Sequence, residues 1–191
     1  TGQTAAYLAS EYGAIVTGID IHPIMIEKAK KRMKKERLPV EILQCSIENV
    51  PLHDYAFDFV LSESVLSFVD KPPSLSEISR LLKNGGQLIA IEFTINKPLE
   101  TAIENEIKQF YGFESLLTEQ DWIHHFEQAG FTTIQVEQKQ PLNNNDSIPE
   151  FDYSQNVELE LYNIMEQHHK MTLKYMDIWD YRIFTCSKYI V

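Results

Sequence analysis

The 191-residue chain has few cysteines, a shortage of positive charge and no long apolar run. Cys45 and Cys186 are too few for a disulfide framework, and neither has the spacing of metal ligands. Lys and Arg number 17 against 28 Asp and Glu, and the net charge of −11 argues against a general nucleic-acid binder. No apolar stretch approaches the ~20 residues of a membrane helix. We therefore expect a soluble cytoplasmic protein with a small-molecule partner, no bound metal, and no contact with nucleic acid or membrane.

Length and composition indicate one folded domain over residues 1–191. The hydrophobic fraction of 43% and the aromatic fraction of 11% are typical of a globular protein. A chain of this length builds one core and is too short for two ordinary domains. Nothing in these totals indicates the oligomeric state.

Helical and extended patterns alternate along the chain. Helices are expected at residues 3–11, 23–37, 75–82, 118–129 and 155–177, with a mainly helical stretch at 94–117. Strands are expected at 14–19, 40–44, 57–62, 87–93, 131–138 and 181–189. A glycine-rich turn at 83–86 should precede the fourth strand. The alternation predicts an α/β fold with a doubly wound sheet of mostly parallel strands.

Gly2 and Asp20 form the first candidate binding feature. Gly2 precedes a helix, whose free N–H groups can face a carboxylate or phosphate. Asp20 ends the next strand, where its carboxylate can accept hydrogen bonds from two ribose hydroxyls. Each residue has an ordinary alternative, since Gly2 can serve packing alone and Asp20 can be favoured by the dipole of the following helix. The pair by itself does not identify a ligand.

Further segments give these two residues a context. In chain order the informative segments are Thr1-Gly2, Gly18-Ile19-Asp20-Ile21, Gln44 to Leu52, Phe57 to Ser62, and Glu77 to Gly86. The last of them contains Glu77-x-x-Arg80 followed by Leu82-Lys83-Asn84-Gly85-Gly86. Together they resemble the class I S-adenosylmethionine (SAM)-dependent methyltransferases, in the branch that acts on small molecules. The resemblance covers residues 1–93 by motif, and the rest of the chain by architecture alone.

The resemblance implies that SAM is the cofactor and that its methyl group passes to an O, N, C or S atom of a small molecule. The implied cofactor contacts are Gly2 in the glycine loop, Asp20 at the ribose, Ile21, Ser46 and Ile47 around the adenine, and Ser62 near the methionine part. Residues 1–93 would be the cofactor-binding half, and residues 94–117 and 139–180 the variable segments that contact or cover the substrate. The last strand would be antiparallel, and the first strand of the family's sheet is expected to be missing from this chain.

Two residues depart from the family's motifs, and the sequence does not identify a catalytic residue. Ser46 stands where the family often has an aspartate, and a hydroxyl accepts a weaker hydrogen bond from the adenine amino group. Asn84 replaces a proline of the turn. Glu63 is the candidate for contact with substrate. Histidines at 124–125 and 168–169 point about 100° apart on a helix, so neither pair can chelate a metal from one face, although one of the later pair could face the cleft.

Two alternative functions share parts of this pattern. An NAD(P)-dependent oxidoreductase would also place Gly2, Ala5 and Asp20 in this way, but it would not explain the segment from Ser46 to Leu52 or the late pair of strands. A protein of the same fold that binds SAM without turnover is compatible with Ser46 and with the incomplete glycine loop. Binding of SAM, its product and NAD would separate these classes.

Overall fold

The structure is a computed structural model that describes residues 1–138 and 159–189. Its helices are α1 (Gln3–Tyr12), α2 (Pro23–Glu36), α3 (Lys71–Leu81), α4 (Thr101–Tyr111), α5 (Glu119–Gln128) and α6 (Leu159–Lys174), with a 3-10 turn, η1, at Leu66–Phe68. Its strands are β1 (Thr17–Asp20), β2 (Glu41–Gln44), β3 (Phe57–Glu63), β4 (Leu82–Ile95), β5 (Thr133–Gln138) and β6 (Trp179–Ser187). The first part of the segment 139–180 and the first residues of the helix expected at 155–177 lie outside the described residues. None of the helices that the structure describes is long and apolar enough to span a membrane.

The strands confirm the α/β class and the antiparallel last strand. Strands β3 and β4 pair in parallel, as do β1 and β2, whereas β6 runs antiparallel to both β4 and β5. The sheet differs from the single one expected, because the described strands form two sheets of order β1-β2 and β3-β4-β6-β5. Strands β1 and β3 are therefore each paired on one side only within the described residues.

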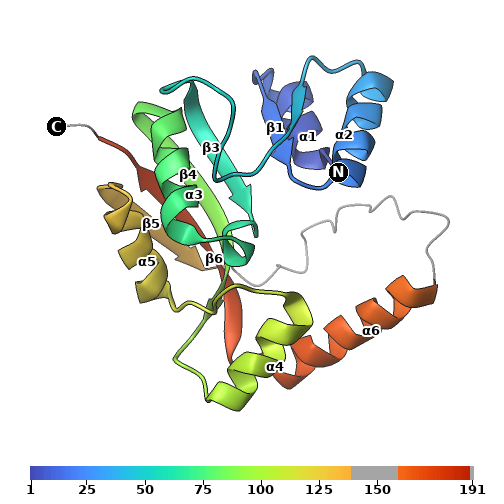
Figure 1. The fold of residues 1–191 in the computed structure, drawn as a ribbon, viewed down its shortest axis with the longest axis vertical. Helices are drawn as coiled ribbons and strands as arrows, with labels where there is room; N and C mark the ends of the chain where they lie inside the picture. The colour runs from blue at the N-terminus through green and yellow to red at the C-terminus, as the bar shows by residue number, and fades with distance from the viewer. Residues whose placement is uncertain (139–158, 190–191) are drawn as a thin grey trace.

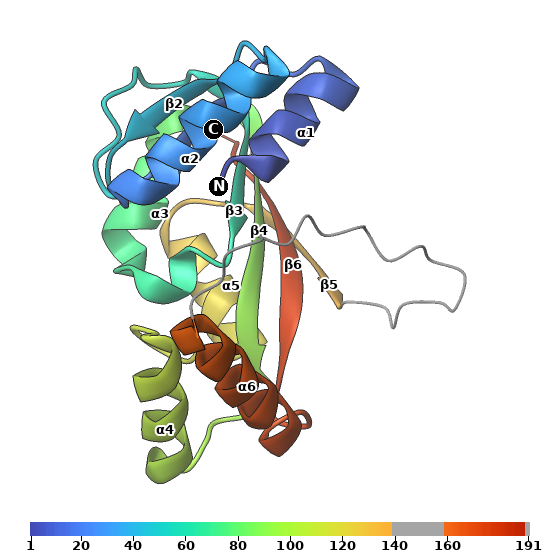
Figure 2. The ribbon, with the colours of Figure 1, turned by 90° about the vertical axis from the view of Figure 1, so that its right-hand side faces the viewer.

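Helices cover the sheets in separate layers (Figures 1 and 2). Helices α3 and α5 lie together on one face of the larger sheet, while α1 and α2 pack with β1 and β2. The main core joins Leu75 and Ile78 of α3 to Trp122 and Phe126 of α5 over the strands, and all four are at most 1% exposed. Helices α4 and α6 lie beside each other at one end of the molecule, where a second, largely aromatic cluster forms.

The starts of β4, α3 and β1 lie three to five residues from those expected. Strand β4 continues through 83–86, which we expected to be a turn before it; the pairing with β3 jumps there, and Gly85 has a φ of +80°. The glycines therefore form a bulge within the strand. Helix α3 begins at Lys71, four residues early, because prolines are tolerated in a first helical turn. Strand β1 is Thr17–Asp20, since Ala14 and Ile15 lie exposed before it.

The start of α5 is fixed by a reciprocal pair of hydrogen bonds. The Thr118 hydroxyl accepts a hydrogen bond from the Asp121 N–H at 3.2 Å, and the Asp121 carboxylate accepts one from the Thr118 N–H at 2.9 Å. This reciprocal pair is a capping box, which fixes the helix that carries Trp122 and Phe126 into the core.

Candidate active site

Asp20 ends β1, and Ser46 follows the end of the adjacent parallel strand β2 by two residues. Asp20 is paired with Gln44 across β1 and β2, and the Cys45 N–H donates to the Asp20 carbonyl at 3.2 Å. The Asp20 carboxylate accepts a hydrogen bond from the His22 N–H at 2.8 Å through Oδ1. Ligands of open α/β sheets bind beyond these strand ends. The arrangement therefore offers a carboxylate beside a loop that follows the neighbouring strand.

Gly2 precedes α1 and lies against α2. Its φ of +73° is left-handed, and no side chain caps the helix within the described residues. A Cβ at this position would lie 2.9 Å from Met33 Cε and 3.0 Å from Ala29 Cβ of α2. The glycine therefore serves both the conformation of the helix start and its packing on α2, so the packing alternative describes part of its role.

The end of β3 meets the first turn of α1. The Thr4 hydroxyl donates to Glu63 Oε2 at 2.8 Å, and this contact joins residues 59 positions apart in the sequence. Ser62 is buried, whereas Glu63 is exposed and turns toward the helix. Ile21 is 70% exposed, and Ile47 is half-buried against the main core. The Thr4–Glu63 contact therefore joins α1 to the end of β3, while Ile21 lies on the surface and Ile47 packs on the main core.

Glu92 supports this region from inside the molecule. Its carboxylate is fully buried and accepts hydrogen bonds from the Ser62 hydroxyl, the Leu66 N–H, and both the N–H and hydroxyl of Ser67, at 2.8–3.1 Å. Burial raises the pKa of Glu92 above its ordinary value, against the opposing effect of these hydrogen bonds. Glu92 lies near the end of the strand expected at 87–93, and its burial was not expected. The sequence signal for this role is that Glu92 lies on the inward face of an apolar strand, where a carboxylate needs hydrogen-bond partners.

Helices α4 and α6 carry much of the second, largely aromatic cluster. Tyr111 at the end of α4 makes a 2.9 Å hydrogen bond to His168 Nδ1 of α6, and its ring packs on Phe93 and Phe113. Burial raises the pKa of the Tyr111 hydroxyl. His168 therefore faces α4 and the aromatic cluster. Among residues 1–138 and 159–189 there is no group of three metal-ligating side chains.

Comparisons with known proteins agree with this geometry. Residues 1–90 match the model of a methyltransferase domain family. The chain is 38% identical over 189 residues to the uncharacterized methyltransferase YodH of Bacillus subtilis, covering 98% of this chain and 81% of the relative. It is 35% identical over 101 residues to the ubiquinone/menaquinone biosynthesis C-methyltransferase UbiE of a Geobacter species, covering 49% of this chain and 42% of the relative.

A solved structure shares the fold. Phosphoethanolamine N-methyltransferase 2 of Haemonchus contortus, in complex with SAM, superposes with a TM-score of 0.80 at 22% identity, over 99% of this chain and 46% of that one. At this identity the likeness shows the fold alone, and the chain spans less than half of that protein. The match to YodH, over most of both chains, shows the family. The chain belongs to the SAM-dependent methyltransferases.

Proposed function

We propose that the protein transfers the methyl group of SAM to a small-molecule acceptor. The observation that carries the proposal is that Gly2 precedes α1, Asp20 ends β1 and Ser46 follows β2 by two residues, while Thr4 of α1 contacts Glu63 at the end of β3. The residues present suit this cofactor, because a helix start beside a carboxylate offers partners for a carboxylate and for ribose hydroxyls. The oxidoreductase alternative loses its support, since the family is that of methyltransferases.

Each candidate residue has a task in this proposal. Asp20 accepts hydrogen bonds from the ribose, Ile21 and Ile47 pack against the adenine, and the Ser46 hydroxyl accepts from its amino group. The start of α1 at Gly2 faces the cofactor carboxylate. Ser62, fixed by Glu92, lies nearest the methionine part. When bound, SAM supplies a methyl group already activated by its sulfonium charge, so the chain's own work is to orient the acceptor and exclude water.

The acceptor site is assigned to residues 94–117 and to the described part of 139–180. Helices α4 and α6 come from these segments and contact each other, for example through Lys174 of α6, which donates to Glu106 Oε1 of α4 at 2.6 Å. Glu63 is the candidate for contact with the acceptor from the opposite side. Relatives named for quinone and phosphoethanolamine methylation support a small molecule, and they leave the accepting atom open. Residues 1–191 then act as a single domain whose first 93 residues hold the cofactor.

The proposal is tested by calorimetric titration of the protein with SAM, S-adenosylhomocysteine and NAD. We expect the two sulfur compounds to bind and NAD not to bind. Asp20→Asn is the informative variant, because its amide oxygen can still accept from the His22 N–H while the charge is lost. It should weaken SAM binding by about 1.5–3 kcal/mol. Binding of NAD alone, or an unchanged affinity in Asp20→Asn, would overturn the assignment.

Turnover is tested by transfer of a radiolabelled methyl group from SAM to a panel of quinols, amines, phenols and thiols. Transfer to any of them that Asp20→Asn reduces supports the enzyme. Tight binding of S-adenosylhomocysteine with no transfer across the panel favours the second candidate, a SAM-binding protein without turnover.

A further inference from the structure

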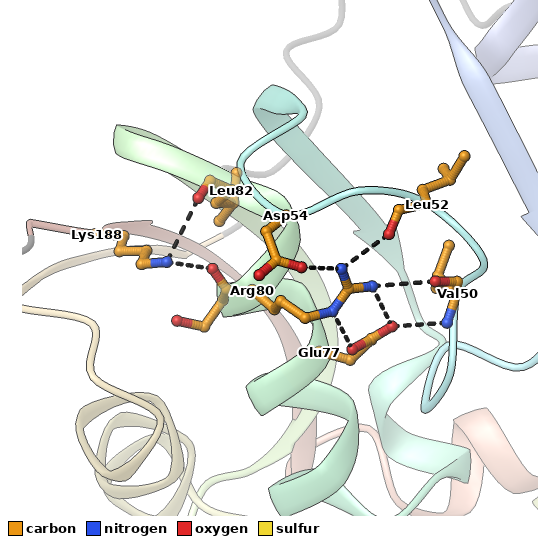
Figure 3. A network of polar contacts seen from close by, with 8 residues as sticks. Val50, Leu52, Asp54, Glu77, Arg80, Leu82 and Lys188 are labelled. Carbon is orange, nitrogen blue, oxygen red and sulfur yellow. Dashed lines mark hydrogen bonds and ion pairs between the residues drawn. The ribbon is translucent and has the colours of Figure 1, made fainter.

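The loop that follows β2 is held by two side chains of α3. After Gln44 the chain leaves the ladder, turns at Ser46, whose hydroxyl accepts from the Glu48 N–H at 3.2 Å, and runs to Asp54 without forming a strand. We call residues 45–54 the base loop, because it carries Ser46 and Ile47. Figure 3 shows Glu77 and Arg80 of α3 pointing together into the second half of this loop.

The contacts between the helix and the base loop use backbone groups. Arg80 donates to the carbonyls of Val50 at 3.0 Å and Leu52 at 2.8 Å, and also to the Asp54 carboxylate (Figure 3). Glu77 Oε1 accepts from the Val50 N–H at 2.7 Å. The two side chains therefore satisfy three backbone groups of a segment that has no strand partner there. A buried or half-buried backbone group without a partner is costly, so the loop's path depends on this pair.

Glu77 and Arg80 also fix each other. Arg80 Nε donates to Glu77 Oε2 at 2.8 Å and Nη2 donates to Oε1 at 2.7 Å, a two-pronged pairing that a lysine cannot form. The pairing holds the pKa of Glu77 below its usual range and that of Arg80 above it, so both are charged at neutral pH. The Glu77 side chain is only 12% exposed. The planar fork of the guanidinium can then reach two carbonyls in fixed directions.

The helix end that carries Arg80 is anchored in turn. The Tyr55 N–H donates to the Arg80 carbonyl at 3.0 Å, and Lys188, which follows β6, donates to the carbonyls of Ser79 and Leu82 (Figure 3). Lys188 also lies 4.8 Å from the centre of the Tyr55 ring. The end of α3 that carries Glu77 and Arg80 is therefore attached to the larger sheet. The position of that sheet in turn fixes the position of the base loop.

We propose that Glu77 and Arg80 are positioning residues for recognition of the cofactor's base. The inference rests on the proposed function, in which Ser46 and Ile47 face the adenine. The pair fixes the far end of the base loop, while the Cys45 N–H fixes its near end to Asp20. With both ends fixed, the Ser46 hydroxyl keeps a constant position relative to the Asp20 carboxylate that binds the ribose. Loss of the contacts at the far end makes Ser46 and Ile47, which contact the base, free to move, and it leaves Asp20 and Gly2 in place.

The test compares two ligands that differ only at the base. S-adenosylhomocysteine carries an amino group on the purine where S-inosylhomocysteine carries an oxygen, and the dissociation constants of both are measured by calorimetry. Arg80→Lys keeps the charge and removes the fork. We expect the wild-type preference for the adenine compound to shrink by about tenfold in Arg80→Lys. Glu77→Gln should reduce it less, because Arg80 retains its contacts to the carbonyls.

Lys83→Met is the matched control, since Lys83 lies three residues from Arg80 and makes an exposed ion pair with Asp58 at 2.8 Å. It should leave the preference unchanged. A purely structural role for Arg80 would lower both affinities by the same factor, and that result overturns the inference, as does a wild type that binds the two compounds equally. If Arg80→Lys does not fold, Glu77→Gln decides between the same outcomes. A wild type that binds neither compound instead refutes the proposed function.

Discussion

Replacement of the buried Glu92 should expose how strongly the end of β3 depends on one carboxylate. In Glu92→Ala the N–H groups of Leu66 and Ser67 lose their acceptor in a place that water does not reach, because Glu92 and Leu66 are 0% and Ser67 is 2% exposed. An unsatisfied buried group costs about 1–3 kcal/mol, so two of them predict a loss of about 2–6 kcal/mol in the free energy of unfolding. The cavity left by the side chain adds to this loss.

The assay is urea unfolding followed by circular dichroism, with Glu127→Ala as the control because Glu127 is exposed on α5. Glu92→Gln should lie between wild type and Glu92→Ala, since its single oxygen can still serve one of the two N–H groups. A Glu92→Ala protein within about 1 kcal/mol of wild type would refute the reasoning.

The difference in unfolding free energy between wild type and Glu92→Ala should change with pH in a definite direction. Because the pKa of Glu92 is raised in the folded state, the folded protein holds the proton more tightly than the unfolded chain does. The stability that Glu92 contributes is therefore full below its ordinary value of 4.5 and is lost as the pH rises through the raised folded value. The deficit of Glu92→Ala relative to wild type should shrink with rising pH in that window. A deficit that grows there would contradict the assigned direction.

Three further substitutions or modifications test other parts of the structure. Gly2→Ala should lower the free energy of unfolding by about 1–2 kcal/mol, because the φ of Gly2 is +73° and the new Cβ would crowd Met33. Gly13→Ala is the control, since Gly13 has a similar φ of +62° with open space around it. A larger loss of unfolding free energy at Gly2 than at Gly13 then measures the contribution of packing, and equal losses would contradict it. Thr118→Ala should cost about 1 kcal/mol by loss of the capping box, and an unchanged unfolding midpoint would show that the box contributes nothing. Burial raises the pKa of the Cys186 thiol to about 12, so Ellman's reagent should modify the half-buried Cys45 first and Cys186 only on unfolding; equal rates would contradict the burial.

The alternation of helices and strands was predictable from local patterns, because each element has a clear period and a recognisable start. The helix expected at 118–129 is α5, Gly2 and Asp20 were found from their places at a helix start and at a strand end, and Ser46 came from the family resemblance. The bulge at Gly85 was not predictable, since a glycine-rich turn and a glycine-rich bulge have the same local composition.

The supports of the site escaped sequence reasoning because they act over long separations. Glu92 holds residues 25–30 positions away, and Arg80 holds the base loop 26–30 positions away. Glu77 and Arg80 were visible as part of a motif, but a motif does not say which backbone groups its side chains bind. Only the packing of α3 against the base loop shows that the two residues clamp it.

The central claim is that an adenosine binds between the start of α1 and the ends of β1 and β2. A crystal structure of the protein grown with S-adenosylhomocysteine tests it most directly. The account predicts that the ribose hydroxyls donate to the Asp20 carboxylate, with the purine edge at Ser46 and the amino-acid part toward Gly2. Ligand density at any other place, or an Asp20 carboxylate turned away from the bound ligand, would contradict it.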